Sequence, residues 1–210
     1  MNKSKLAIIG AGELGLQILD LLNYSSEKFI AVGFFDDTME VGSKIAGIEV
    51  LGGLNDIEII YRAGIFDKLI IAIGYKHMAV RENLFLKYDK QIPFAKIIHN
   101  SCIMNNKSKI GDGSVLYPGC IIDKNVSIGN NVLLNLGVTI AHDCLVGNNS
   151  FFAPRVVVSG FVHIGKNCFV GTNATIIDNI TIGENTIVGA GSVVIKDVND
   201  NTKIVGNPAK

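Results

Sequence analysis

The chain has 210 residues, 48% of them hydrophobic, so it is long enough to bury one large core or two small ones. Its 19 Lys and Arg residues balance 19 Asp and Glu residues, and this neutrality gives no electrostatic reason to expect nucleic acid or an anionic membrane as a partner. The start of the chain does not have the pattern of a signal peptide, and no apolar run reaches the ~18 residues of a membrane helix, so we expect a cytoplasmic protein with no membrane insertion.

The first part of the chain has the pattern of a small α/β unit. Residues 5–9 read as a buried strand, and a Gly-Ala-Gly-Glu-Leu-Gly turn at 10–15 leads into a helix predicted from residue 14 to about residue 23. A second strand is predicted at 29–35, ahead of Asp36 and Asp37, and a further strand at 68–73.

A strand-to-helix turn of this kind suits a phosphorylated ligand. Its glycines let the backbone approach a phosphate, the helix N-terminus favours anions, and an acidic pair after the second strand can accept hydrogen bonds from ribose hydroxyls. A dinucleotide site would need a domain of about 150 residues, whereas the next pattern begins near residue 98. A smaller nucleotide ligand and a tight turn with no ligand both remain open at this point.

A period of six residues dominates the chain from residue 98 onward. Every sixth position from Ile110 to Val194 holds a large apolar residue, and Ile98 and Met104 extend the series backwards. A helix would show a period near 3.6 and a simple strand a period of 2. The pattern therefore predicts short strands joined by tight turns, three hexapeptides to each coil of a triangular prism, with the apolar anchors pointing inward.

Two other positions of the hexapeptide carry a recurrent residue type. The position after the anchor is often glycine, as at Gly129 and Gly147, which we interpret as a backbone angle that other residues reach only with strain. The fourth position after the anchor is small or β-branched, and it holds every cysteine of the chain: Cys102, Cys120, Cys144 and Cys168. The cysteines are therefore predicted to be small buried hydrophobes rather than disulfide partners or metal ligands.

Together these patterns resemble a known family. The repeat resembles that of the left-handed β-helix acyltransferases, and a short Rossmann-like domain ahead of it resembles the PglD/NeuD family of bacterial sugar acetyltransferases. The resemblance is carried by the glycine turn at 10–15, the pair Asp36-Asp37, the segments 72–74 (Ala-Ile-Gly) and 141–147 (Ala-His-Asp-Cys-Leu-Val-Gly), and the ending at 205–210. It implies an α/β Rossmann-like domain at 1–97 and a left-handed parallel β-helix at 98–210, assembled as a homotrimer with active sites between neighbouring prisms.

The resemblance also implies a substrate. In PglD-like members the N-terminal domain holds a UDP-linked amino sugar, and the residues implied to line that pocket are Gly12, Glu13, Leu14, Asp36, Asp37 and Tyr75. Glu13 and Leu14 replace the glycine and histidine usual in the family turn, which keeps open the O-acetylation of sialic acid or another sugar hydroxyl. A non-catalytic trimeric scaffold that binds a nucleotide sugar is the alternative from a different functional class.

Acetyl transfer from acetyl-CoA needs a base, an oxyanion stabiliser and a groove for the pantetheine arm. Of the four histidines, only His142 lies in the segment that matches the family. It follows the anchor Ile140 by two positions and should project outward, where an imidazole can take a proton at neutral pH. The resemblance implies that His142 is the general base, that Asp143 orients its ring, and that transfer is direct, without an acyl-enzyme.

Family positions also imply where the coenzyme lies. Acetyl-CoA is expected along Phe151, Gly160, Thr172 and Ala190. Gly160 is the candidate oxyanion donor, because a glycine lets the thioester carbonyl approach its N–H closely. Phe151 stands where the family commonly has a histidine, and its ring can pack on the pantetheine arm or the adenine. The spacing of the histidines does not suggest a zinc site, so no metal is expected.

Overall fold

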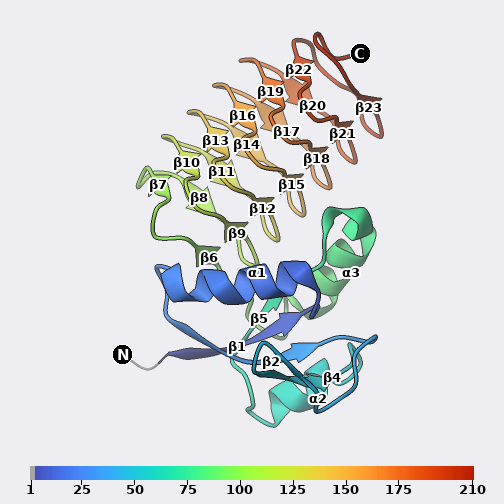
Figure 1. Cartoon of the computed structure of the whole chain (residues 1–210). Coiled ribbons are helices and arrows are strands. Elements are labelled where there is room, and N and C mark those ends of the chain that lie inside the picture. The colour runs from blue at the N-terminus through green and yellow to red at the C-terminus, as the bar shows by residue number, and fades with distance from the viewer. Residues whose placement is uncertain (1–2) are drawn as a thin grey trace. The chain divides into compact units, whose positions relative to one another are not determined.

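The computed structural model describes residues 3–210, which divide into two compact units, residues 3–97 and 98–210. Each unit has a hydrophobic core of its own. The first unit is an α/β unit, and the second is a stack of short parallel strands, coloured from green to red in Figure 1. Within residues 3–210, no helix is both long enough and apolar enough to cross a membrane.

The N-terminal unit is built on a five-stranded sheet in the order β3-β4-β2-β1-β5. The pairs β1–β2, β1–β5 and β2–β4 are parallel, and the short edge strand β3 pairs antiparallel with β4. This arrangement confirms the predicted Rossmann-like α/β fold. The elements are β1 (Ser4–Ile9), α1 (Glu13–Leu21), η1 (Leu22–Tyr24), β2 (Phe29–Phe35), β3 (Lys44–Ile45), β4 (Ile48–Gly52), α2 (Ile57–Arg62), β5 (Lys68–Ile71), η2 (Tyr75–His77) and α3 (Met78–Tyr88).

Strand β1 lies between β2 and β5, so the chain leaves β1 toward one neighbour and later returns on the other side. The carboxyl end of β1 is therefore a topological switch point, the place where open α/β sheets bind ligands. Backbone hydrogen bonds fix the segments that meet there, from Gly10 N to Phe35 O (2.9 Å) and from Ala72 N to Ile9 O (2.8 Å). The glycine turn and the segment after β5 thus share one edge of the sheet.

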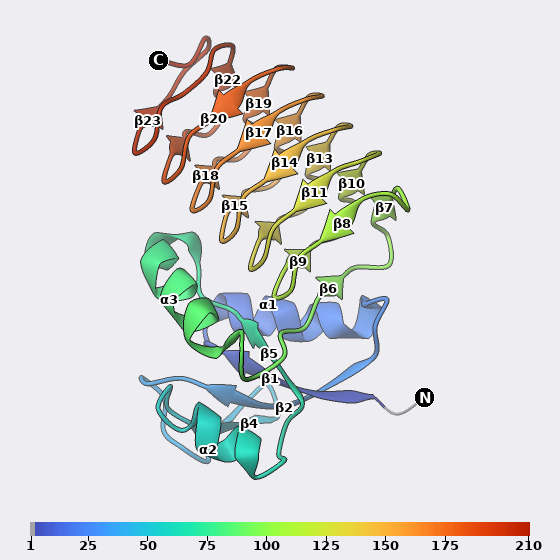
Figure 2. The same cartoon turned by 180° about the vertical axis from the view of Figure 1, so that it is seen from behind.

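The C-terminal unit confirms the predicted left-handed parallel β-helix. Its strands form three parallel sheets (Figures 1 and 2). Within a sheet, each strand pairs with the strand one coil later, 18 residues along the chain. The first face holds β7 (Ile103–Met104), β10 (Ile121–Ile122), β13 (Thr139–Ile140), β16 (Val157–Val158), β19 (Thr175–Ile176) and β22 (Val193–Val194). The second face holds β8 (Lys109–Ile110), β11 (Ser127–Ile128), β14 (Leu145–Val146), β17 (His163–Ile164) and β20 (Thr181–Ile182). The third face holds β6 (Ile97–Ile98), β9 (Val115–Leu116), β12 (Leu133–Leu134), β15 (Phe151–Phe152), β18 (Phe169–Val170), β21 (Ile187–Val188) and β23 (Lys203–Ile204).

The apolar anchors fill the prism as the six-residue period predicts. From Leu116 to Val194 every anchor is at most 4% exposed, and burying a side chain of this size stabilises a fold by about 1.5–3 kcal/mol. Cys120, Cys144 and Cys168 are fully buried among the anchors, Cys102 is partly buried, and all four are free thiols. The assignment of the cysteines to the core is confirmed.

The interpretation of the recurring glycines was wrong. Gly129 and Gly147 do not have a positive φ, so backbone conformation does not require glycine there. A Cβ on Gly147 would instead lie 2.4 Å from Lys166 N on the next coil, and a Cβ on Gly129 would lie 2.8 Å from Asn148 N. These glycines are needed because successive coils approach too closely for any side chain at that position.

The left-handed residues lie at the turns, two positions further on. Every sixth residue from 113 to 191 has a positive φ, and most of these residues are Asn or Gly, the types that adopt this conformation at least cost. We name the three edges of the prism by their turn residues. They are the His142 edge (124–125, 142–143, 160–161 and 178–179), the asparagine edge (130–131, 148–149, 166–167 and 184–185) and the Thr172 edge (118–119, 136–137, 154–155, 172–173 and 190–191).

Side chains of successive coils hydrogen-bond to one another along the asparagine edge. Asn131 Nδ2 donates to Asn149 Oδ1 (2.7 Å), Asn149 Nδ2 to Asn167 Oδ1 (2.7 Å), and Asn167 Nδ2 to Asn185 Oδ1 (3.2 Å). Because Asn131 and Asn149 are almost fully buried, these bonds satisfy amides that would otherwise destabilise the fold. The stacked turns therefore place equivalent side chains within hydrogen-bonding distance, 18 residues apart.

Candidate active site

His142 lies on the turn between β13 and β14, at the His142 edge. Its side chain is 47% exposed, whereas the anchor Ile140 is fully buried. The imidazole therefore projects outward, as its distance from the anchor predicts. The backbone carbonyl of His142 accepts a hydrogen bond from Phe161 N on the next coil (3.1 Å), which fixes the turn.

Asp143 contacts the ring of His142 and is itself contacted from the preceding coil. Asp143 Oδ2 lies 3.0 Å from His142 Nδ1, and Asp143 Oδ1 accepts a hydrogen bond from Asn125 Nδ2 at 2.8 Å. The hydrogen bonds from Asn125 and then from His142 lower the pKa of Asp143 below its ordinary value. The ionised carboxylate favours a proton on Nδ1, and in that tautomer Nε2 of His142 is the nitrogen that can accept a proton.

Gly160 and Phe161, on the next coil, contact the imidazole of His142 from the side of that coil. A Cβ on Gly160 would lie only 2.8 Å from His142 Cε1 and 2.9 Å from Nε2, so the ring occupies space that only glycine leaves open. The ring of Phe161 meets the imidazole edge to face, with centroids 5.1 Å apart and an angle of 87° between the planes. Phe161 has a φ of 57° and is 53% exposed, an unusual combination for a large apolar residue.

The backbone N–H of Gly160 is available at the same edge. Within the described part of the chain it donates to no protein acceptor, while Gly160 O accepts from Asn179 N (3.1 Å). A backbone N–H that is not used within the protein and lies beside an imidazole is the type of donor that stabilises the oxyanion of a tetrahedral intermediate. The role of Gly160 as oxyanion donor stays a prediction.

The thiol nearest to His142 is not placed for nucleophilic attack. Cys144 is fully buried, and its Sγ donates to Ser159 O at 3.0 Å. Burial raises the pKa of the Cys144 thiol, which disfavours the reactive thiolate. Among residues 3–210, no group of three His, Cys, Asp or Glu side chains is arranged to hold a metal ion.

The other residues predicted to bind the coenzyme lie elsewhere on the prism. Thr172 and Ala190 are exposed neighbours on the Thr172 edge, where Gly191 N donates to Thr172 O (2.8 Å). The strands of the first face, such as β16, separate that edge from His142 and Gly160. Phe151, on the third face, is only 6% exposed and packs beside Phe169 with ring centroids 6.1 Å apart. In a single chain, therefore, these predicted coenzyme contacts are not brought together.

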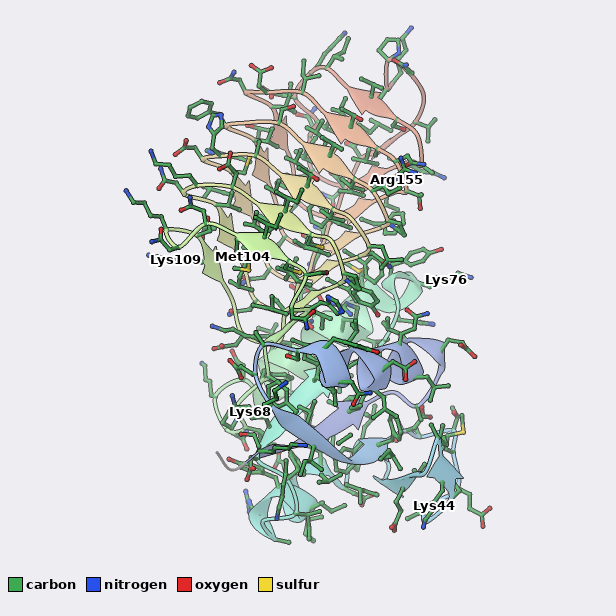
Figure 3. All side chains as sticks on the ribbon, turned by 60° about the vertical axis from the view of Figure 1, so that its left-hand side comes forward. Lys44, Lys68, Lys76, Met104, Lys109 and Arg155 are labelled. Carbon is green, nitrogen blue, oxygen red and sulfur yellow. The ribbon has the colours of Figure 1, made fainter. Side chains whose placement is uncertain are left out.

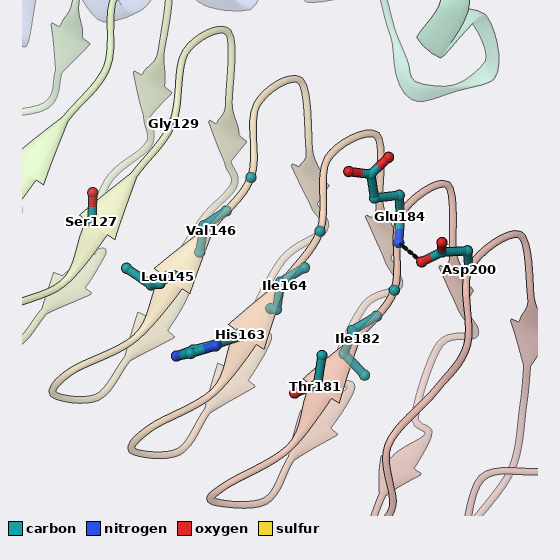
Figure 4. Close-up of a pocket in the computed structure, with 13 residues that line it drawn as sticks. Ser127, Gly129, Leu145, Val146, His163, Ile164, Thr181, Ile182, Glu184 and Asp200 are labelled. Atoms are coloured by element: carbon teal, nitrogen blue, oxygen red, sulfur yellow. Dashed lines mark hydrogen bonds between the residues drawn. The ribbon is translucent and has the colours of Figure 1, made fainter.

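A groove of about 420 Å³ runs across the second face and extends to the asparagine edge (Figure 4). Ser127, Leu145, His163 and Thr181 project into it from successive coils, and Glu184, whose N–H donates to Asp200 Oδ1 (2.8 Å), lies at one end. His142 is not among its lining residues.

Elsewhere on the prism, the side chains of Lys109 and Arg155 project away on opposite sides (Figure 3).

In the N-terminal unit, the three glycines of the predicted ligand turn have different roles. Gly10 has a φ of +102°, and a Cβ there would lie 2.7 Å from Ala72 O. A Cβ on Gly15 would lie 2.2 Å from Gly10 O, so this glycine lets α1 pack against the turn. Gly12, the N-cap of α1, has nothing within 4 Å of a would-be Cβ and carries no side-chain cap. Gly12 therefore leaves the helix N-terminus open to an anionic ligand.

Asp36 supports this turn through its own hydrogen bonds. Its Oδ2 accepts from Ala11 N (2.9 Å), and its Oδ1 accepts from Thr38 N (2.9 Å) and from Thr38 Oγ1 (2.6 Å). Burial by itself raises the pKa of Asp36, but these hydrogen bonds outweigh it and leave the pKa below its ordinary value. Both carboxylate oxygens already accept hydrogen bonds within the protein. Asp36 therefore shapes the turn whether or not it also contacts a ligand.

The remaining predicted substrate residues surround the same edge of the sheet. Asp37 is exposed, and its Oδ1 accepts from Leu54 N at 2.7 Å. Glu13 is exposed at the first position of α1, Leu14 is partly buried, and Tyr75 is 44% exposed in η2, directly after the segment that follows β5. All of them come from segments at the carboxyl edge of the sheet, where the sequence pattern predicts a ligand.

Asn125 and Phe161 were not identified as site residues from the sequence. The signal that identifies them is the coil length, because each lies 18 residues from Asp143. Adding or subtracting one coil from a candidate residue gives its neighbours along an edge of the prism. A six-residue period alone shows the anchors but does not show which outward residues meet.

Comparison with known proteins agrees with the layout of the two units. The sequence profile of the family described as bacterial transferase hexapeptide (six repeats) matches residues 101–136 and 161–196, and that of the PglD N-terminal domain matches residues 5–88. No curated protein sequence matches the chain.

Several solved structures resemble the whole chain. PerB from Caulobacter crescentus, in complex with CoA and GDP-perosamine, is 28% identical over 98% of this chain and 96% of its own, with a TM-score of 0.90. The acetyltransferase domain of PglB from Neisseria gonorrhoeae, in complex with acetyl coenzyme A, is 26% identical over 100% of this chain and 99% of its own, with a TM-score of 0.89. WeeI from Acinetobacter baumannii AYE is 29% identical over 98% of both chains, with a TM-score of 0.82.

Variants of the Caulobacter enzyme have also been solved. Its perosamine N-acetyltransferase was crystallised with one histidine replaced by asparagine or by alanine, in each case with CoA and GDP-perosamine. Both variants are 28% identical to this chain over 98% of its length, with a TM-score of 0.88.

Proposed function

Because this chain belongs to the PglD-like hexapeptide-repeat sugar acetyltransferases, we propose that it transfers the acetyl group of acetyl-CoA to the amine of a nucleotide-linked amino sugar. The observation that carries the proposal is the exposed His142–Asp143 pair at an edge of the prism, with the imidazole against Gly160. PerB, which is similar over nearly the whole chain, binds CoA and GDP-perosamine. The acetyltransferase domain of PglB binds acetyl coenzyme A.

We propose a direct transfer. His142 Nε2 accepts a proton from the attacking amine, a bond forms between the amine nitrogen and the acetyl carbon, and the carbon–sulfur bond breaks as CoA leaves as its thiolate. Asp143 keeps the proton on Nδ1 and offsets the positive charge that develops on the ring. The Gly160 N–H stabilises the oxyanion that forms on the acetyl carbonyl. The burial of Cys144 is consistent with a mechanism that has no acyl-enzyme.

The nucleotide belongs to the N-terminal unit in this proposal. The open helix N-terminus at Gly12 suits a diphosphate, and the carboxylates of Asp36 and Asp37 lie after β2, where ribose or base would be read. Glu13 and Tyr75 then flank the ligand. We propose UDP as the nucleotide by analogy with PglD-like members, and GDP is the competing choice because PerB binds GDP-perosamine.

We also propose that the enzyme is a homotrimer. Three of the predicted coenzyme contacts lie on two edges of one prism, with Gly160 on the His142 edge and Thr172 and Ala190 on the Thr172 edge. Packing of one prism against another would let the His142 edge of one chain face the Thr172 edge of its neighbour, so that one coenzyme could touch both. Sedimentation equilibrium should then give three times the mass of the 22.5 kDa chain.

A thiol-release assay over a panel of acceptors tests the proposal. We expect acetyl-CoA to be consumed with a UDP- or GDP-linked 4-amino sugar and not with free sialic acid. His142→Ala should lower kcat by about 10²–10⁴-fold and leave the thermal unfolding midpoint unchanged, because the ring is exposed. Acetylation of a free sugar hydroxyl would favour the O-acetyltransferase, and failure to bind acetyl-CoA would favour the non-catalytic scaffold. A near-native rate for His142→Ala would contradict the assignment of the base.

A further inference from the structure

Asn125 lies one coil before Asp143, at the same place in its turn. The two residues have φ values of 59° and 58°, and the paired strands that lead into the turns align Ile121 with Thr139 and Ile122 with Ile140. This register brings the two side chains together along the His142 edge. The result is the hydrogen bond from Asn125 Nδ2 to Asp143 Oδ1 at 2.8 Å.

The hydrogen bond repeats the chemistry of the asparagine edge with one change. There an amide donates to the amide one coil further on, as Asn131 does to Asn149 (2.7 Å). At the His142 edge the acceptor is the carboxylate of Asp143, whose second oxygen is 3.0 Å from His142 Nδ1. At the asparagine edge such a hydrogen bond only joins two coils. At the His142 edge the carboxylate that accepts it also contacts the imidazole.

An exposed carboxylate does not orient a histidine well by itself. The side chains of His142 and Asp143 are 47% and 36% exposed, and an exposed ion pair loses most of its attraction to solvent screening and side-chain freedom. A second hydrogen bond on the other carboxylate oxygen limits rotation of the carboxylate plane. The amide is also the largest cause of the lowered pKa of Asp143, in keeping with a hydrogen bond to the charged form.

We propose that Asn125 is a positioning residue, which acts through Asp143 to hold the imidazole of His142 with its proton on Nδ1. The assignment rests on the proposed function, in which Nε2 of His142 is the base. Asn125 itself need not touch either substrate. Its role ends at the carboxylate that it orients.

Asn125→Gly is the sharpest test, because glycine removes the amide and keeps the left-handed backbone. Asn201→Gly is the matched control, since Asn201 has a φ of 56° and is exposed on another turn. We expect Asn125→Gly to lower kcat by about 3–10-fold, as for loss of one hydrogen bond of ordinary net strength, because the bond is exposed to solvent. The KM values for acetyl-CoA and the acceptor should change less than twofold, and kcat of Asn201→Gly should match that of the unmodified chain.

A double-mutant cycle separates an action through Asp143 from a general effect on the turn. In an Asp143→Ala background, Asn125→Gly should change kcat less than twofold, because the group through which it acts is gone. An equal loss in both backgrounds would overturn the proposal. So would equal kcat values for Asn125→Gly and Asn201→Gly.

Nuclear magnetic resonance gives a readout that needs no substrate. In protein labelled with ¹⁵N at histidine, long-range proton–nitrogen correlations report which ring nitrogen of His142 carries the proton. We expect the Nδ1-protonated form to dominate in the unmodified chain and in Asn201→Gly, and to lose population in Asn125→Gly. An unchanged tautomer in Asn125→Gly would overturn the proposal even if acetyl transfer were established. If no acceptor were acetylated, the tautomer would still report on the positioning role.

Discussion

The contact between Gly160 and His142 allows activity to be separated from stability. In Gly160→Ala the new Cβ would start 2.8 Å from Cε1 and 2.9 Å from Nε2 of the imidazole, whereas ordinary contact begins near 3.4 Å. The ring must therefore retreat by about 0.6 Å. A displacement of this size is enough to stretch the Nδ1–Oδ2 distance to Asp143 from 3.0 Å to about 3.6 Å, which is no longer a hydrogen bond.

The fold should tolerate this change. The atoms that clash belong to the free end of an exposed side chain, and Gly160 does not have a positive φ that alanine would strain. Catalysis should not tolerate it, because a base displaced by a fraction of an ångström loses alignment with the amine. We expect kcat to fall by about 10–100-fold while the unfolding midpoint stays within about 2 °C.

Gly147→Ala is the matched contrast. Its Cβ would meet the backbone of the next coil, 2.4 Å from Lys166 N and 2.5 Å from Gly165 C, and this backbone cannot swing away. We expect a loss of about 1–3 kcal/mol and a lower midpoint, with kcat unchanged at a temperature where the protein remains folded. Calorimetry and the thiol-release assay on both variants give the two readouts. A Gly160→Ala enzyme with native kcat, or one that unfolds as readily as Gly147→Ala, would refute the reasoning.

Three further predictions follow from the contacts described above. Asp36→Asn should lower stability at neutral pH by about 1–3 kcal/mol, because the Asp36 carboxylate accepts three hydrogen bonds. Because the pKa of Asp36 is lowered in the folded protein, its stabilising contribution is present above the ordinary carboxyl pKa of about 3.9. It is lost as the pH falls through the pKa of the folded state. The unfolding midpoints of Asp36→Asn and the unmodified chain should therefore converge below about pH 4. Asn149→Ala should cost about 3 kcal/mol, from two lost amide hydrogen bonds and an alanine at a φ of 58°, and should lower the midpoint by about 6–12 °C with little change in kcat. Gly12→Ala should raise KM for the nucleotide sugar with no change in midpoint, whereas Gly15→Ala should lower the midpoint, because only at Gly15 would the Cβ meet backbone, 2.2 Å from Gly10 O.

Each of these predictions has an outcome that contradicts it. A constant difference in midpoint between Asp36→Asn and the unmodified chain from pH 3 to pH 8 would mean that the carboxylate charge is not what stabilises the turn. An Asn149→Ala protein of native stability would show that the amides of the asparagine edge contribute nothing. An unchanged KM in Gly12→Ala would argue that no ligand approaches the N-terminus of α1.

The repeat shows how far sequence reasoning reaches. The six-residue period predicts the prism, the inward anchors and the buried cysteines, because an inward position recurs at every face whatever the outward residues are. The same reasoning misassigned the glycines that follow the anchors. It explained Gly129 and Gly147 by backbone conformation. In the structure they are required because successive coils lie close together, and a sequence pattern carries no information on that distance.

The candidate site divides in the same way. The segment at 141–147 singles out His142 and Asp143 through its resemblance to the family. Asn125, Gly160 and Phe161 become neighbours of the imidazole only when the coil closes after 18 residues and stacks the turns. The roles of the residues predicted to bind acetyl-CoA and the nucleotide sugar remain predictions.

Periodicity and local residue order are thus enough to predict the type of fold, and the family resemblance adds the choice of His142 among the histidines. Only the tertiary structure shows which groups touch that imidazole, and that Asp36 contacts the glycine turn through Oδ2 while its Oδ1 accepts hydrogen bonds from Thr38. The physical reason is that side-chain contacts depend on how coils and strands are brought into register. That register is set by backbone hydrogen bonds between segments distant in the chain.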